Sequence, residues 1–147
     1  MLLTNALLAD GTRADVRICL DLIDEVGAAL TPAPGEESLD LGGRLLLPAP
    51  AEPHAHLDKA FLAERFENPT GDLIGAVEAM EANRHLLTVP DIAERAERAV
   101  RLLVSNGITA IRTHADTTID NGLRSVEALI GVRDRLRDLC HIEVVAR

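Results

Sequence analysis

Apolar and polar positions follow two different patterns along this chain. In residues 1–47 short apolar pieces are separated by turn signals such as Asp10-Gly11 and Gly42-Gly43. That arrangement is typical of a small antiparallel β unit built from several short strands. The pieces expected to form these strands are Leu2–Leu8, Val16–Leu20, Leu22–Val26 and Arg44–Leu47.

From Pro48 onward, strand-like segments alternate with stretches of helical periodicity. Strands are expected at residues 51–56, 108–114 and 142–146, and Pro50 is tolerated only where the first of them begins. The order strand, helix, strand, helix, strand predicts parallel strands joined by crossover helices. The expected helices are residues 72–87, a second that Thr88 begins and Gly107 ends, and a third that runs to about residue 139.

Apolar residues recur near helical spacing in each expected helix. The first stripe contains Leu73, Ile74, Val77, Met80 and Leu87, and the second contains Ile92, Ala96, Val100, Leu103 and Val104. In the third helix the expected inward residues are Leu123, Val126, Ile130 and Leu136.

Composition narrows the possible partners of the chain. With 15 Lys and Arg against 24 Asp and Glu among 147 residues, the formal net charge is −9, which repels nucleic acids and anionic membranes. No stretch approaches the ~20 apolar residues that span a bilayer. Cys19 and Cys140 lie far apart and form no metal-binding pair, so reduced thiols and a cytoplasmic location are expected.

The strongest chemical signal is the histidine pair His54 and His56 at the end of the expected strand 51–56. Side chains at positions i and i+2 of a strand point to the same face, so both imidazoles can reach one cation. Two solvated histidines on a polar edge strand are the alternative for such a short motif.

A second polar cluster follows the next expected strand. In sheets of parallel strands the functional side chains lie at the carboxyl ends of the strands. His114 ends residues 108–114 and Asp116 follows them, just as Asp58 follows the first strand. Contact with substrate is one interpretation of these three residues, and hydrogen bonding to a metal-bound imidazole is another for the aspartates. A satisfied half-buried histidine and two loop or cap carboxylates are the structural alternatives. Lys59 can pair with either aspartate.

Three ordered segments of this chain resemble the amidohydrolase superfamily, within it the branch of cytosine deaminase and N-isopropylammelide amidohydrolase. These segments are Leu45–Pro48 leading into Glu52–Lys59, then Asn106–Ile108, then Arg112–Asp116. The resemblance covers the amino-terminal portion of such enzymes. It implies an α/β fold in which residues 1–50 are part of a small β-sandwich domain. Residues 51–147 would then be the first three strands of a TIM-type (β/α) barrel.

The resemblance also implies a function. It indicates a hydrolase that cleaves a C–N bond of a small amino-substituted heterocycle, with one divalent metal ion, zinc or iron, held by His54 and His56. Such a metal lowers the pKa of its bound water to about 7. The acid and base residues of these enzymes lie on later strands and have no counterpart here. The chain is therefore expected either to need a missing carboxyl-terminal portion or to be an inactive, truncated fragment that self-associates as a homo-oligomer.

Overall fold

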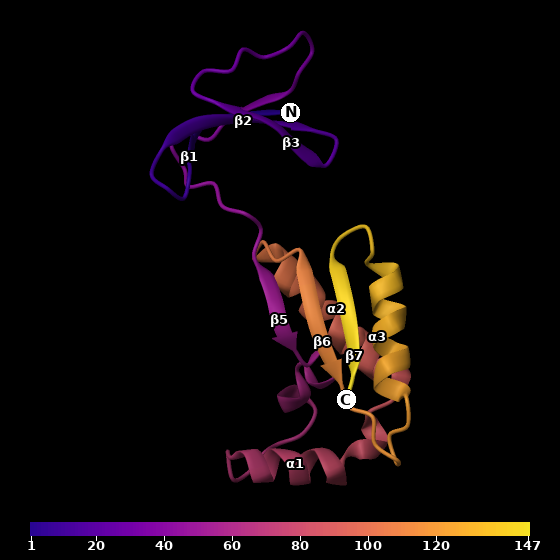
Figure 1. Cartoon of the computed structure of the whole chain (residues 1–147). Helices are drawn as coiled ribbons and strands as arrows, with labels where there is room; N and C mark the ends of the chain where they lie inside the picture. Colours follow the sequence, from indigo (N-terminus) through magenta and orange to yellow (C-terminus); the bar gives the residue numbers. More distant parts are fainter. The chain divides into compact units, whose positions relative to one another are not determined.

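The computed structural model describes residues 1–147 as two compact units, Met1–Pro48 and Ala49–Arg147 (Figure 1). The first unit contains only strands, and the second combines strands with helices. None of the helices has the length and apolar character that crossing a membrane requires.

The first unit is a four-stranded sheet in the order β3-β2-β1-β4. Neighbouring strands β1, β2 and β3 are antiparallel, as the sequence predicts. The prediction missed β4, which pairs with β1 in parallel, and the strand expected at residues 44–47 is reduced to one bridge between Leu7 and Leu45. The strands are β1 (Leu2–Leu7), β2 (Arg13–Cys19), β3 (Leu22–Gly27) and β4 (Ser38–Asp40).

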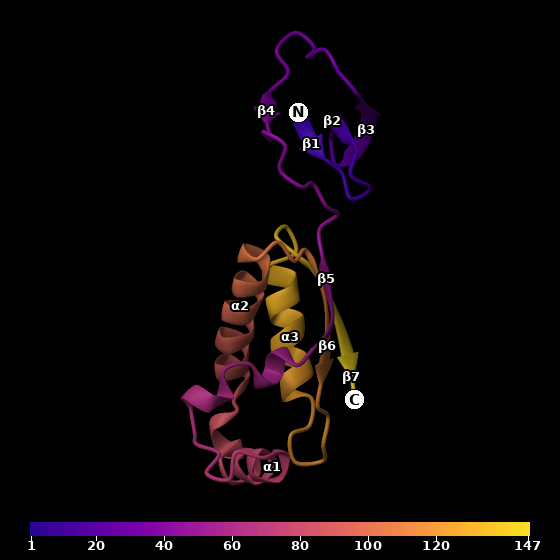
Figure 2. The same cartoon turned by 90° about the vertical axis from the view of Figure 1, so that its left-hand side faces the viewer.

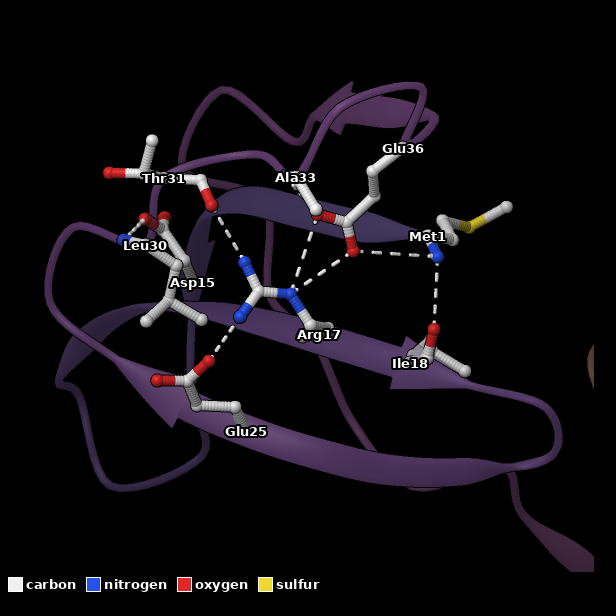
Figure 3. A network of polar contacts seen from close by, with 9 residues as sticks. All are labelled: Met1, Asp15, Arg17, Ile18, Glu25, Leu30, Thr31, Ala33 and Glu36. Carbon is white, nitrogen blue, oxygen red and sulfur yellow. Dashed lines mark hydrogen bonds and ion pairs between the residues drawn. The ribbon is translucent and has the colours of Figure 1, made fainter.

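One arginine of the first unit fixes the loop between β3 and β4 (Figure 3). Arg17 Nε donates to Glu36 at 3.1 Å, Nη2 donates to the Thr31 carbonyl at 2.8 Å, and Nη1 pairs with Glu25. The Ala33 amide and the Arg17 guanidinium together hold the pKa of the Glu36 carboxyl below its ordinary value. The loop is therefore tied to β2 by charge-assisted hydrogen bonds.

The second unit contains a parallel sheet in the order β5-β6-β7, which agrees with the prediction of parallel strands. Strand β5 begins directly after Pro50, because proline has no amide hydrogen for the ladder. The elements are β5 (Ala51–Ala55), α1 (Leu73–Ala82), α2 (Val89–Ser105), β6 (Ala110–Ala115), α3 (Arg124–Arg135) and β7 (His141–Ala146), with short 3-10 turns η1 (Leu57–Lys59), η2 (Leu62–Glu64) and η3 (Arg84–Leu86).

Helix α2 begins and ends at the predicted signals. The Thr88 side chain caps its first turn by accepting the Asp91 amide, and Pro90 lies in that turn. Gly107 follows the helix with a φ of 88°, a left-handed conformation that glycine adopts without strain. Helix α1 is shorter than predicted, since it ends at Ala82 and continues only as η3.

Helices α2 and α3 cover one face of the sheet and enclose the core with it (Figure 2). Ile111, Ala115 and Ile142 point from the strands into this core. Of the inward residues predicted for α3, Leu136 is fully buried and Val126 is partly buried against the core, whereas Leu123 and Ile130 are exposed. The buried face of α3 contains the small residues Ser125 and Ala128 beside larger aliphatic ones, and it consists of Ser125, Ala128, Leu129, Val132 and, just after the helix, Leu136.

Candidate functional site

Three histidine rings gather where β5 and β6 end. The ring centroid of His54 lies 5.3 Å from that of His56 and 4.3 Å from that of His114, and the His56 and His114 centroids are 5.9 Å apart. The side chains of Thr113 and Ala115, which alternate with His114 along β6, are buried. The histidine rings therefore lie on the sheet face that α2 and α3 leave uncovered.

An irregularity in β5 sets the direction of the histidine pair. Glu52 pairs with Ile111 and Ala55 pairs with Thr113, so β5 has one more residue than β6 between these two pairs. This is a β-bulge, and Pro53 lies within it. The His54 amide donates to the Glu52 side chain at 2.9 Å instead of continuing the ladder. Without the extra residue, His54 would have the same orientation as Glu52 and would turn away from His114.

The position of His114 favours its neutral form. Desolvation of the ring lowers the pKa of His114 below its ordinary value, and the nearby His54 and His56 lower it further. A neutral imidazole keeps one nitrogen lone pair free to accept a hydrogen bond or to bind a metal.

Lys59 joins the two strand ends. Its Nζ lies 2.7 Å from Asp116 Oδ2 and 3.5 Å from His56 Nδ1. Of the two aspartates that the sequence offered to Lys59, Asp116 is the ion-pair partner in the structure. The pair is only partly exposed, so solvent screens it less than an open surface pair.

Asp58 is buried, and its carboxylate connects the turn after β5 to the backbone that follows β6. Its Oδ2 accepts the Asp116 amide at 3.2 Å, while its Oδ1 has no hydrogen-bond partner. Just before it, the Leu57 amide donates to the buried Thr113 hydroxyl at 3.0 Å. The turn that follows His56 is therefore fastened to β6 at two points.

Arg95 holds the backbone of the turn after β5, a role that the sequence did not predict. This α2 side chain is 3% exposed, and its Nη1 donates to the carbonyls of Asp58 and Ala60 at 3.0 and 2.6 Å. Its Nε donates to Asp91 at 3.0 Å. A signal was present in the sequence, because Arg95 stands between Ile92 and Ala96 on the apolar stripe, where a charged residue needs an internal partner.

The site residues fit part of a metal centre. His54 and His56 offer two nitrogen donors on one face, but no group of three or more His, Cys, Asp or Glu side chains is placed to hold a metal ion. Catalytic zinc sites generally have three protein ligands. The other histidines do not add to this set, since His85 lies in η3 and His141 begins β7 at the opposite end of the sheet.

A cavity of about 680 Å³ adjoins the strand ends. Lys59 and Asp116 form its polar end, and α1 together with the segment around η2 supplies its mostly apolar wall. A smaller cavity of about 270 Å³ is also lined by Lys59 and Asp116, together with Asp58 and Ser125.

Comparison with known proteins gives consistent relatives, although no family model matches the chain. The chain is 32% identical over 136 residues to a pterin deaminase of Rhizobium rhizogenes, covering 91% of this chain and 31% of the relative. Its structure matches 5-methylcytosine deaminase of Klebsiella pneumoniae liganded with 5-fluorocytosine, with a TM-score of 0.87 and 28% identity over 99% of this chain and 36% of the other.

A second solved structure, the N-isopropylammelide isopropylaminohydrolase of Burkholderia multivorans, matches with a TM-score of 0.80 and 31% identity, again over 99% of this chain and 36% of the other. The predicted resemblance to the amidohydrolase superfamily is confirmed. The chain matches the amino-terminal portion of these amidohydrolases and spans about a third of their length. The mixed α/β fold that this resemblance implied is present.

Proposed function

We propose that this chain is the amino-terminal part of a metal-dependent amidohydrolase that hydrolyses a C–N bond of a small amino-substituted heterocycle. The observation that carries the proposal is the grouping of His54, His56 and His114 on one open sheet face at the carboxyl ends of parallel strands. The names of the relatives support the same chemistry, since they include a pterin deaminase and a 5-methylcytosine deaminase.

In this proposal His54 and His56 hold one divalent ion, zinc or iron, through neutral imidazole nitrogens. Such an ion supplies an activated water and polarises the bond to be cleaved. Lys59 and Asp116 form a charged wall beside His56, and His114, neutral and half-buried, presents a hydrogen-bonding nitrogen to the substrate. Asp58 holds the turn that carries Lys59 against β6.

The proposed architecture places the two units in larger domains. Residues 1–50 would contribute to a β-sandwich domain, and residues 51–147 would form the first three strands of a TIM-type barrel. The second unit supports this proposal because parallel strands with helices on one face are the repeating element of such barrels. The remaining metal ligands and the acid and base would come from a carboxyl-terminal portion or from a second polypeptide, and the cytoplasmic location stays a prediction.

A second candidate is a catalytically incompetent fragment that self-associates. Two observations favour it for this chain by itself: the histidine set has two predicted metal ligands, and large aliphatic residues of the first unit are exposed.

Metal content distinguishes these candidates. We expect the purified chain to retain zinc or iron, measured by mass spectrometry, and the variant His54→Ala/His56→Ala to lose it. His85→Ala/His141→Ala is the matched control, because it also removes two histidines, and these are exposed and lie outside the site. Equal metal content in the two double variants would reject the ligand assignment.

Release of ammonia tests whether this chain contains all the groups that the hydrolysis needs. Incubated with a panel of amino-heterocycles, the metal-loaded chain should release no ammonia, because the acid and base groups are missing. Turnover that disappears in His54→Ala/His56→Ala would show that this chain is already a working enzyme.

A further inference from the structure

We propose that Arg95 is a positioning residue of the candidate site, because it fixes the backbone on both sides of Lys59 and so determines where the Lys59 ammonium group lies. Lys59 is the only lysine among the 15 basic residues of the chain, and its Nζ lies beside both His56 and Asp116. The chemical importance of this role rests on the proposed function, in which Lys59 forms part of the charged wall of the site.

A single nitrogen of Arg95 joins the residues before and after Lys59. Arg95 Nη1 donates to the carbonyl of Asp58 at 3.0 Å and to that of Ala60 at 2.6 Å. These two carbonyls have no backbone partner, since the hydrogen bonds of the turn itself are accepted by earlier carbonyls. Arg95 therefore satisfies the two acceptors that the turn leaves free, and it fixes the backbone of Lys59 at both ends.

The guanidinium of Arg95 is itself held in one direction by its own helix. Its Nε donates to Asp91 Oδ2 at 3.0 Å, and its Nη2 forms an ion pair with the same oxygen at 2.8 Å. Asp91 is fixed in turn, because its Oδ1 pairs with Arg65 at 3.0 Å and its amide donates to the Thr88 side chain. Arg95 is buried, so water does not compete for these contacts, and Nη1 is presented to the turn in a fixed orientation.

Asp116 holds the same turn from the end of β6. Its amide donates to Asp58 Oδ2 at 3.2 Å, and its carboxylate pairs with Lys59 Nζ at 2.7 Å. Ordering a lysine side chain is costly, because its four-carbon stem has many rotamers. The ammonium group therefore stays in one place only where the backbone beneath it is fixed, and Arg95 fixes that backbone.

The conformation just after the turn increases the need for this contact. Phe61 follows Ala60 and has a φ of 59°, which is unfavourable for a residue with a Cβ atom. The Arg98 guanidinium lies 3.5 Å above the centre of the Phe61 ring. The Arg95 contact with the Ala60 carbonyl acts on the peptide group directly before Phe61. Loss of this contact should let the segment leave the left-handed conformation and take Lys59 with it.

A purely structural role is the alternative, in which Arg95 stabilises the second unit without determining the position of Lys59. Because Lys59 is the only lysine, its reaction with an acetylating reagent distinguishes the two roles. Peptide mass spectrometry at constant pH gives the acetylation rate of Lys59 separately from that of the amino group of Met1. The ion pair with Asp116 must open before the amine can react. Arg95→Met should therefore raise the rate about fivefold, which corresponds to an ion pair worth about 1 kcal/mol.

Two variants bracket this result. Asp116→Asn removes the ion-pair partner and should raise the acetylation rate of Lys59 as much as Arg95→Met does. Ile142→Ala is the matched control, because it truncates a buried core residue of the same unit on β7 and removes no contact of the turn. It should leave the acetylation rate close to that of the parent chain. Far-UV circular dichroism checks that each variant is folded.

Several outcomes would overturn the inference. One is an unchanged acetylation rate in folded Arg95→Met, and another is an equal increase in Ile142→Ala, because loss of stability alone would then release Lys59. If Arg95→Met does not fold, Arg95→Gln takes its place, since it keeps one amide donor and should give a smaller increase. Failure of both variants to fold would assign Arg95 to folding only, which also overturns the inference.

The proposed function fails or stands by a different measurement. If His54→Ala/His56→Ala keeps its metal while Arg95→Met releases Lys59, the metal-ligand assignment is wrong and the positioning role of Arg95 stands. If the double histidine variant loses its metal while Arg95→Met leaves Lys59 unchanged, the ligand assignment stands and the positioning role is wrong.

Discussion

The two compact units of this chain differ in how far they cover their own apolar side chains. In the second unit, α2 and α3 lie over the parallel sheet and bury a continuous core that includes Val100, Leu129 and Ile142. In the first unit, only the residues Leu2, Leu3, Ala6 and Val16 form a buried apolar set. Its large exposed aliphatic residues are Leu20, Leu22, Ile23, Val26, Leu39, Leu45 and Leu47.

The difference follows from the number of layers. A sheet buries one face only when another layer lies against it, and the first unit has no helix to provide that layer. The second unit has its own second layer, so its stability should be sensitive to single core substitutions. The first unit should be tolerant of substitutions on its exposed aliphatic residues unless a partner covers them.

The largest expected effect comes from Arg95→Met in the second unit. This change leaves the carbonyls of Asp58 and Ala60 without their guanidinium partner and leaves Asp91 with Arg65 as its only arginine partner, which should lower the free energy of unfolding by about 4 kcal/mol. Urea denaturation followed by helical circular dichroism measures it, since only the second unit contains α-helices. Arg98→Met is the control, because Arg98 is exposed and pairs with Glu64 at the surface. A similar loss in both variants would contradict a special role for Arg95.

Leu129→Ala should have the next largest effect. Leu129 is 1% exposed within the core, and its truncation leaves a cavity between α3 and the sheet that should cost about 3 kcal/mol. The same substitution at Leu102, which is 54% exposed on α2, should change stability by less than about 0.5 kcal/mol. If the two truncations were equivalent, the second unit would lack the packed core described here.

Thr88→Ala should have a smaller effect. It removes the hydroxyl that accepts the Asp91 amide at the start of α2, and loss of such a cap costs about 1 kcal/mol. Thr88→Ser keeps the hydroxyl and should stay close to the parent chain in the same denaturation experiment. A full loss of stability in Thr88→Ser would mean that the methyl group, and not the cap, is important.

The smallest effect is expected in the first unit from Ile23→Ser. Ile23 is 70% exposed on β3, so the change should alter protection of the β1–β3 amides from hydrogen exchange by less than about 0.5 kcal/mol. A destabilisation above about 1 kcal/mol that depends on protein concentration would contradict the expected tolerance of the first unit. It would show that a second copy covers this surface in solution.

Local signals predicted much of the second unit from the sequence. The start of α2 after Thr88 and its end before Gly107 were predicted correctly, because a capping residue acts on the adjacent turn of the helix. On the inward face of α3, Val126 and Leu136 were predicted correctly and Leu123 and Ile130 were not. The buried Ser125 and Ala128 were missed because small residues give little apolar signal in a sequence. Strand β4 was missed because its three residues gain their pairing from β1, which is distant in sequence.

Of the candidate site, the sequence predicted the histidines but not the residues that position the backbone around them. His54, His56 and His114 could be placed at strand ends by counting strands, and the structure brings their rings together. The contacts of Arg95 with the carbonyls of Asp58 and Ala60 depend on how α2 docks, and no sequence period encodes that docking. The cavity beside α1 likewise depends on the loops that precede and follow that helix.

The bulge at Pro53 also makes the two borders of the parallel sheet unequal. Near that border Pro53 has no amide hydrogen and the His54 amide is taken by Glu52, so β5 is a poor template for a foreign strand. At the opposite border, β7 pairs with β6 over six uninterrupted residue pairs and has no neighbour beyond it. Unwanted aggregation through this sheet should therefore start at β7 and not at β5.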